Sequence, residues 1–127
     1  MGFVVIWSDE QIEDVSDDFS FHVAKSLEKS LVEKERQLKW VNSMADLRKR
    51  FQDIISLNEL TVAEIRFSSM SSEYRALCVV VPEEETLFYW TTVPKKGSYQ
   101  QRQLEMMRDN SDRINQIVQK KLDQHSS

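Results

Sequence analysis

The second half of the chain carries basic residues whose spacing could form one cationic surface. Arg66 and Arg75 fall in two separate stretches of strand-forming residues, and Lys95 and Lys96 directly follow a third stretch. Successive side chains along a strand point to opposite faces of a sheet, so neighbouring strands can place the two arginines on the same face. Tyr99 follows within reach of the lysines. Such a surface could face the phosphate backbone of RNA.

Each of these residues also has an ordinary structural interpretation. A basic side chain at the end of a strand or helix is commonly just solvated. Tyr74, Tyr89 and Trp90 are more typical of a half-buried sheet than of a base-stacking surface. Cys78 lies between apolar residues of a predicted strand, where it fills space and makes a poor metal ligand or nucleophile. We therefore expect no metal site and no cofactor.

The first half of the chain predicts one strand followed by a helical hairpin. The apolar run at residues 3–7 is typical of a buried strand, and Ser8 with Gln11 three residues later has the spacing of a capping box. Apolar residues then recur at helical spacing over residues 23–41, which predicts one amphipathic helix. A second helix, capped by Ser43, would carry its apolar positions on one face: Leu47, Phe51, Ile54 and Ile55.

The second half predicts three strands and a final helix. Residues 61–67, 74–81 and 86–93 are rich in β-branched and aromatic side chains, and a short acidic connection joins the last two. Helical spacing resumes after Gly97 and runs to a polar tail from about residue 123. The order β-α-α-β-β-β-α predicts a single α+β domain over residues 1–127. Its antiparallel sheet of about four strands would carry the helices on one face and leave the other face free.

The length and composition fit one domain. The 127 residues are 40% hydrophobic and include a single cysteine, which excludes a scaffold of internal disulfides. No apolar run is long enough for a transmembrane helix or a signal peptide. The two glycines form neither of the common glycine-rich phosphate-binding motifs. We therefore expect a soluble, cytoplasmic protein.

The charge is unevenly distributed along the chain. The net charge is −4, but residues 1–24 hold six Asp and Glu residues and no Lys or Arg. Subtracting this −6 from the total leaves +2 for the rest of the chain. The total alone would argue against a nucleic-acid partner, whereas the distribution leaves one open. The acidic segment could cap a helix and aid solubility, or it could lie against the basic face.

Three motifs resemble the RelE/ParE superfamily of toxins from toxin–antitoxin systems, in particular its RelE/HigB-like members. They are AEIRF at residues 63–67, EYRALCVVV at residues 73–81, and FYWTTVPKK at residues 88–96 with a helix following. In that family an ELR-type pattern, a YR pair opening the next strand and a closing KK or KR pair recur. The similarity is best over residues 60–108, and the first half fits the family only in its order of elements.

The resemblance implies ribosome-dependent cleavage of messenger RNA without a metal ion, by attack of a ribose 2'-hydroxyl on the adjacent phosphate. This reaction needs a base, positive charge on the phosphate and an acid for the leaving 5'-oxygen. Carried over by motif, Arg75 would stabilise charge on the phosphate, and Lys95 and Lys96 would grip the phosphate or supply the proton. Tyr99 would stack on a base or assist proton transfer. The residues that would bind RNA phosphates are Arg66 and Arg102.

The chain departs from the family pattern at three points. Glu64 stands where nuclease members carry a second basic residue, and Glu73 stands where a glycine is common. The whole chain is acidic, whereas active toxins of the family are usually strongly basic.

Three functions therefore stay open. The first is a toxin whose partners are a cognate antitoxin, the ribosome and messenger RNA, with no membrane and with a homodimer as a further option. The second is a non-enzymatic protein-binding module on the same fold, such as a ParE-like gyrase inhibitor or an inactive relative. The third is an unrelated α+β adaptor domain.

Overall fold

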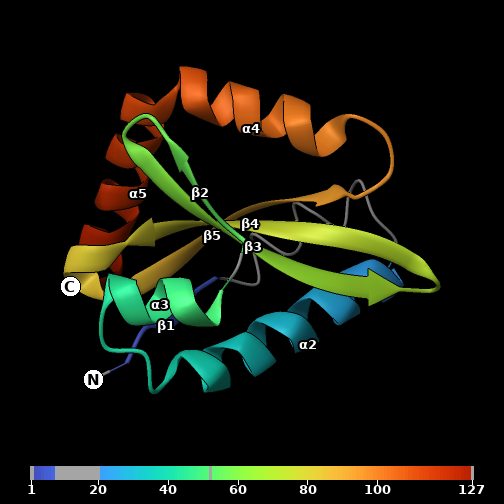
Figure 1. Ribbon diagram of the computed structural model, residues 1–127, viewed down its shortest axis with the longest axis horizontal. Helices are drawn as coiled ribbons and strands as arrows, with labels where there is room; N and C mark the ends of the chain where they lie inside the picture. The colour runs from blue at the N-terminus through green and yellow to red at the C-terminus, as the bar shows by residue number, and fades with distance from the viewer. Residues whose placement is uncertain (1, 8–20, 52, 127) are drawn as a thin grey trace.

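The computed structural model describes residues 2–7, 21–51 and 53–126, so the predicted capping box and most of the acidic segment lie outside the described residues. Within the described part, five strands form one mixed sheet in the order β1-β5-β4-β3-β2 (Figure 1). The strands are β1 (Val4–Ile6), β2 (Ile54–Leu57), β3 (Leu60–Ser69), β4 (Ser72–Val81) and β5 (Thr86–Pro94). The α-helices are α2 (Phe21–Leu38), α3 (Met44–Arg50), α4 (Tyr99–Asp109) and α5 (Ser111–Ser126). None of these helices has the length and apolar character needed to cross a membrane.

The α+β class is confirmed, but the prediction of an antiparallel sheet of four strands is wrong in number and direction. β1 runs parallel to β5 at one edge, with Val4 opposite Thr86, whereas the other pairs are antiparallel. Three predicted strands lie where expected, as β3, β4 and β5. β1 can be parallel because helices, rather than a hairpin turn, connect it to the rest of the sheet.

The additional strand, β2, occupies residues predicted to continue the second helix. α3 ends at Arg50 instead. Ile54 and Ile55 pair with β3 across a tight turn, in which Asn58 adopts a left-handed φ of 54°. Isoleucine is β-branched and asparagine tolerates the left-handed region, so these residues favour a hairpin over a longer helix.

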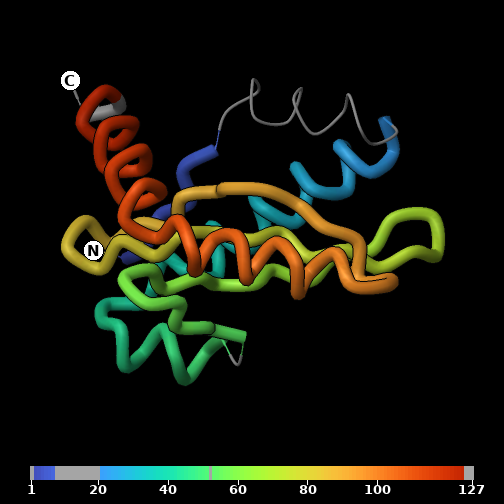
Figure 2. The backbone as a smooth tube through the Cα atoms, turned by 90° about the horizontal axis from the view of Figure 1, so that it is seen from above, coloured from blue at the N-terminus to red at the C-terminus, as the bar shows by residue number. Residues whose placement is uncertain are grey.

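Helices cover both faces of the sheet, so the prediction of one free face is wrong. α2 and α3 pack on one face, and α4 and α5 on the other (Figures 1 and 2). The reason is visible in β4, where Leu77 and Val79 join the core with α4 and α5, while Ala76 and Cys78 join the core with α2. A strand that is apolar on both faces needs cover on both sides. The result is three layers with two apolar cores.

The predicted C-terminal helix is in fact two helices that meet at Asn110. This residue has φ −116° and ψ 26°, and its Nδ2 donates to the Met106 carbonyl at 2.8 Å. α5 then continues to Ser126, so residues 123–126 of the expected polar tail are helical. The break allows Met107 of α4 and Ile114 of α5 to enter the same core.

The hairpin between β3 and β4 turns through Met70 and Ser71, whose φ values are 49° and 70°. Positive φ at both positions is the geometry of a type I' turn, where Asn-Gly is favoured because other residues meet a steric cost. Replacing the pair by Asn-Gly (Met70→Asn with Ser71→Gly) is therefore expected to raise the free energy of unfolding by about 1 kcal/mol. Urea denaturation measures the change. Ser72→Gly, one residue later in β4, is the control and should be destabilising, and a double variant no more stable than the wild type would contradict the turn.

Cys78 lies in the core between the sheet and α2. Its side chain is fully buried, and burial raises the pKa of the thiol to about 12. Because the thiolate is the reactive form, we expect the native protein to resist iodoacetamide at neutral pH and to react only as urea unfolds it. Mass spectrometry of native and urea-treated samples measures this. Rapid labelling without urea would show that this core opens readily.

Candidate nucleic-acid site

Arg66 and Arg75 lie directly opposite each other on the face of the sheet that α4 covers. They are paired residues in the register of β3 with β4. Arg66 lies on the same face of β3 as Val62, and Arg75 lies on the same face of β4 as Leu77. Both apolar residues belong to the core with α4 and α5. The strands thus bring the two predicted arginines together on one face.

Carboxylates accompany the cations on this face. Arg66 Nη2 lies 2.9 Å from Asp53 Oδ1, and Lys95 Nζ lies 2.9 Å from Glu73 Oε2. The Lys95 backbone N–H also donates to the Glu73 carbonyl at 3.0 Å, and the ammonium lowers the pKa of the Glu73 carboxyl. Together with two further residues these groups form what we call the charged cluster: Asp53, Glu64, Arg66, Glu73, Arg75 and Lys95. Its three cations and three carboxylates balance in formal charge.

Glu64 is the most buried carboxylate of the charged cluster, with 7% of its surface exposed. Gln100 of α4 donates from Nε2 to Glu64 Oε1 at 2.5 Å. Burial raises the pKa of the Glu64 carboxyl, and nearby Asp53 adds to this, while the hydrogen bond from Gln100 and the charges of Arg75 and Arg66 oppose it. A buried carboxyl whose pKa is raised beside specific charged partners is suited to proton transfer.

Arg75 is also largely buried, with 7% of its surface exposed. Its Nη1 donates to the Tyr74 carbonyl at 3.1 Å. Among the residues that the structure describes, no carboxylate forms an ion pair with Arg75. A guanidinium has five N–H donors in a rigid fork, so Arg75 keeps donors for an anionic ligand.

The other three predicted site residues are Lys96, Tyr99 and Arg102, and none of them belongs to the charged cluster. Lys96 and Tyr99 follow Lys95 along the chain and are exposed, Tyr99 at 58%. Arg102 is exposed on α4, two residues after Gln100 and therefore about half a turn around the helix from it. Arg102 therefore faces away from the sheet and does not join the cluster.

The aromatic residues of the motifs lie in the cores or pack against them partly buried, as their structural interpretation predicts. Tyr89 is fully buried and shares a hydrogen bond of 2.7 Å with Thr92. Tyr74 stacks on Phe67 with ring centroids 5.4 Å apart, on the side of the sheet that faces α2. Both rings therefore stabilise the fold, and fully buried Tyr89 is not available for base stacking.

Sequence reasoning missed Asp53 and Gln100 as members of the site. Asp53 reaches Arg66 only because β2 exists, and Gln100 reaches Glu64 only because α4 covers this face. One signal could have pointed to them. Glu64 is a charged residue inside an apolar strand, and a buried charge requires polar partners.

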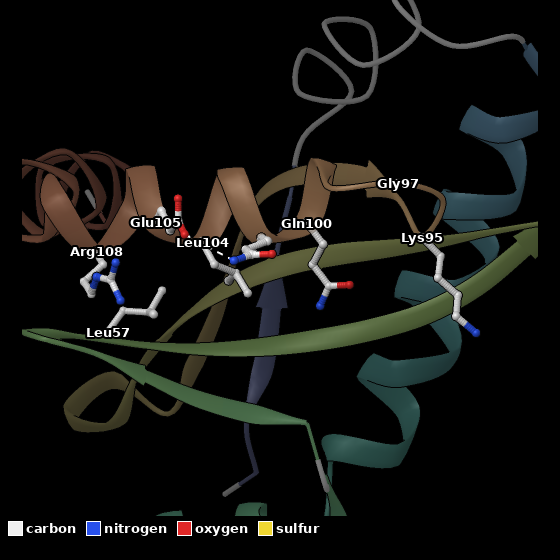
Figure 3. Close-up of a pocket in the computed structure, with 8 residues that line it drawn as sticks. Leu57, Lys95, Gly97, Gln100, Leu104, Glu105 and Arg108 are labelled. Carbon is white, nitrogen blue, oxygen red and sulfur yellow. Dashed lines mark hydrogen bonds between the residues drawn. The ribbon is translucent and has the colours of Figure 1, made fainter.

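A groove of about 440 Å³ runs between α4 and the strands, next to the charged cluster (Figure 3). We call it the α4 groove. Lys95 of the charged cluster lines one end together with Gln100, which donates to Glu64, so the groove adjoins the cluster. Gln100, Leu104 and Arg108 point from α4 toward the strands beneath it (Figure 3). The residues that line the groove are Leu57, Lys95, Gly97, Gln100, Gln101, Leu104, Glu105 and Arg108.

Comparison with known proteins gives no relative for this fold and site. No family model matches the chain, and neither a curated protein nor a solved structure matches it. The RelE/ParE resemblance therefore stays a prediction that depends on the three sequence motifs. Within residues 2–7, 21–51 and 53–126, no three His, Cys, Asp or Glu side chains gather as metal ligands would.

The charged cluster places groups of the kind that bind anions next to a group of the kind that exchanges protons. Arg75 and Arg66 offer guanidinium donors, and Glu64 offers a carboxyl that burial biases toward the protonated form. A phosphate that enters the cluster would compete with Asp53 for Arg66 and with Glu73 for Lys95. Binding should therefore weaken steeply as the salt concentration rises.

Proposed function

We propose that the chain is the toxin component of a toxin–antitoxin pair and cleaves messenger RNA on the ribosome without a metal ion. The observation that carries the proposal is the pairing of Arg66 with Arg75 across β3 and β4, beside the buried Glu64. A metal-free cleavage of RNA needs positive charge on the phosphate next to a proton-accepting group, and this pairing supplies both. The motif resemblance supplies the ribosome and the antitoxin as partners.

In the proposed reaction, the ribose 2'-hydroxyl attacks the adjacent phosphorus and the bond to the 5'-oxygen breaks. Ionised Glu64 takes the proton of the 2'-hydroxyl. Arg75, with Arg66 beside it, stabilises the negative charge that grows on the phosphate oxygens. Lys96 gives a proton to the leaving 5'-oxygen, with Lys95 as its neighbour on the phosphate. The products are a 2',3'-cyclic phosphate and a 5'-hydroxyl.

Expression in bacteria combined with mapping of RNA ends tests the function. The wild type should arrest growth and leave cuts with 2',3'-cyclic phosphate ends in ribosome-bound messenger RNA. The double variant with Arg75→Ala and Lys96→Ala should do neither. Equal growth arrest by both proteins, or no cuts by either, would exclude the nuclease function. Ends that carry linear phosphates would exclude attack by the 2'-hydroxyl.

A non-enzymatic protein-binding module on the same fold is the second candidate. The observation that favours it is the charge balance of the cluster, in which Asp53 and Glu73 already occupy Arg66 and Lys95. Growth arrest without RNA cuts, kept by the double variant, would support this second function.

A further inference from the structure

We propose that the α4 groove binds the base next to the scissile phosphate, and that it selects single-stranded RNA whose base carries an exocyclic amino group. This inference extends the proposed function by naming the substrate class of the same site. Apart from Lys95, the residues that line the groove take no part in the proposed reaction.

The length and charges of the groove fit an extended polymer with an anionic backbone. Gln100, Leu104 and Arg108 are spaced by four residues along α4, so they cover about 12 Å of helix on one face. Lys95 lies at the end near the charged cluster, and Arg108 lies at the other end (Figure 3). A cation at each end of a groove suits successive phosphates of one strand.

The middle of the groove suits a nucleobase. Leu57 from β2 and Leu104 from α4 give it apolar walls. Gln101 and Glu105 stand on the same helix, and Gln101 Nε2 lies 3.4 Å from Glu105 Oε1. Apolar walls with a few polar groups are the usual lining of a small-molecule site. A base can enter only when it is unstacked and unpaired, which excludes duplex RNA.

Glu105 gives the groove a preference among bases. An ionised carboxylate accepts hydrogen bonds and cannot donate them. It can therefore accept from the amino group of cytosine, adenine or guanine, whereas uracil has no amino group and its single donor, N3–H, lies between two carbonyl oxygens that repel a carboxylate. Gln101 adds an amide that can both donate and accept. The groove should therefore disfavour uridine.

Fluorescence anisotropy with labelled 2'-O-methyl oligonucleotides tests the proposal, because such RNA cannot be cleaved through its 2'-oxygen. We expect oligocytidylate and oligoadenylate to bind the wild type about tenfold more tightly than oligouridylate. They should also bind more tightly than a duplex of the same length. Glu105→Gln should remove most of the difference between cytidylate and uridylate, because a glutamine can donate to the uracil carbonyl.

Two variants test the position of the RNA. Leu104→Trp fills the groove and Arg108→Ala removes the far cation, and each should weaken oligocytidylate binding by about tenfold. Arg48→Ala is the control, because Arg48 lies on α3 at the opposite face of the sheet. Circular dichroism checks that the Leu104→Trp protein is folded, and Arg108 is exposed, so its variant keeps the test independent of core packing.

The outcomes separate this inference from the proposed function. Equal binding of duplex and single strands, no preference against uridylate, or normal affinity in both variants would overturn the groove proposal even if the wild type cleaves RNA. Absence of any oligonucleotide binding would overturn it too. If the wild type does not cleave RNA but binds oligonucleotides with the expected preferences, the nuclease function is excluded and the groove proposal stands.

Discussion

Under the proposed nuclease function, replacing Arg75 with methionine is expected to lower RNA cleavage by at least about a hundredfold, because the variant loses the buried guanidinium that would face the phosphate. Methionine keeps an unbranched stem in the space that Arg75 fills on β4, so packing should change little. The loss should appear mainly in the rate of cleavage at saturating RNA, because Arg66 and Lys95 still attract the backbone. Single-turnover cleavage of ribosome-bound RNA measures the rate.

Two comparisons make the Arg75 result specific. Arg48→Met removes one positive charge from α3, on the other face of the sheet, and should leave cleavage unchanged. Arg75→Lys keeps the charge but loses the planar fork, so it should recover only part of the rate. If Arg75→Met cleaves as fast as Arg48→Met, the phosphate is not bound at the charged cluster.

The positions of β3, β4 and β5 could be predicted because their signals are local. Each strand is a run of β-branched and aromatic residues bounded by turn formers, and the pairing of β4 with β5 follows from the short connection at Pro82. Alternation along two such strands was then sufficient to place Arg66 and Arg75 on one face. This part of the site depends on period-two geometry alone.

The remaining architecture could not be predicted because it depends on contacts between distant segments. Ile54 and Ile55 fit a helix stripe as well as a strand, and pairing with β3 decides between the two. The choice of face for α4 depends on apolar residues that β4 presents on both sides, whereas the order of elements alone predicts helices on one face. Asp53 and Gln100 lie at the site because β2 pairs with β3 and α4 covers this face of the sheet.

The local charge balance changes what the net charge of −4 means for function. Much of the negative charge lies outside the described residues, in the segment before Phe21. The carboxylates that matter to the site are the three that contact or surround its cations, namely Asp53, Glu64 and Glu73. An acidic chain can therefore still hold a phosphate-binding surface, provided that the ligand displaces Asp53 and Glu73 from their partners.

Under the proposed mechanism, Glu64→Gln is expected to lower cleavage by about a hundredfold or more, because the amide cannot take the proton of the 2'-hydroxyl. The wild-type rate should fall as the pH drops through the raised pKa of Glu64, since only the carboxylate is a base. The variant should lack this acidic limb. Besides burial, four neighbours set the pKa of Glu64 and therefore the pH at which the rate falls: Asp53 just before β2, Arg66 on β3, Arg75 on β4 and Gln100 on α4. Glu33→Gln is the matched control, because Glu33 is exposed on α2 at the other face of the sheet, and this variant should keep the fall in rate at acidic pH.

As the pH rises, the contribution of Glu64 to the free energy of unfolding should fall, whereas the proposed activity should rise. The folded pKa of Glu64 is raised above its ordinary value of 4.5, so between these two pH values the folded state binds more protons than the unfolded state. The contribution of Glu64 to stability is therefore complete below pH 4.5 and is lost as the pH rises through the folded pKa. Glutamine does not titrate and can still accept from Gln100, so the variant should gain on the wild type as the pH rises from 4 to 7. Other carboxyls titrate in both proteins and cancel in the difference. Urea denaturation across this range measures it, and a variant that loses stability at neutral pH would show that ionised Glu64 supports the fold. The proposed reaction needs Glu64 as a carboxylate, whereas the fold favours its protonated form, and such a conflict between stability and function is typical of active-site groups.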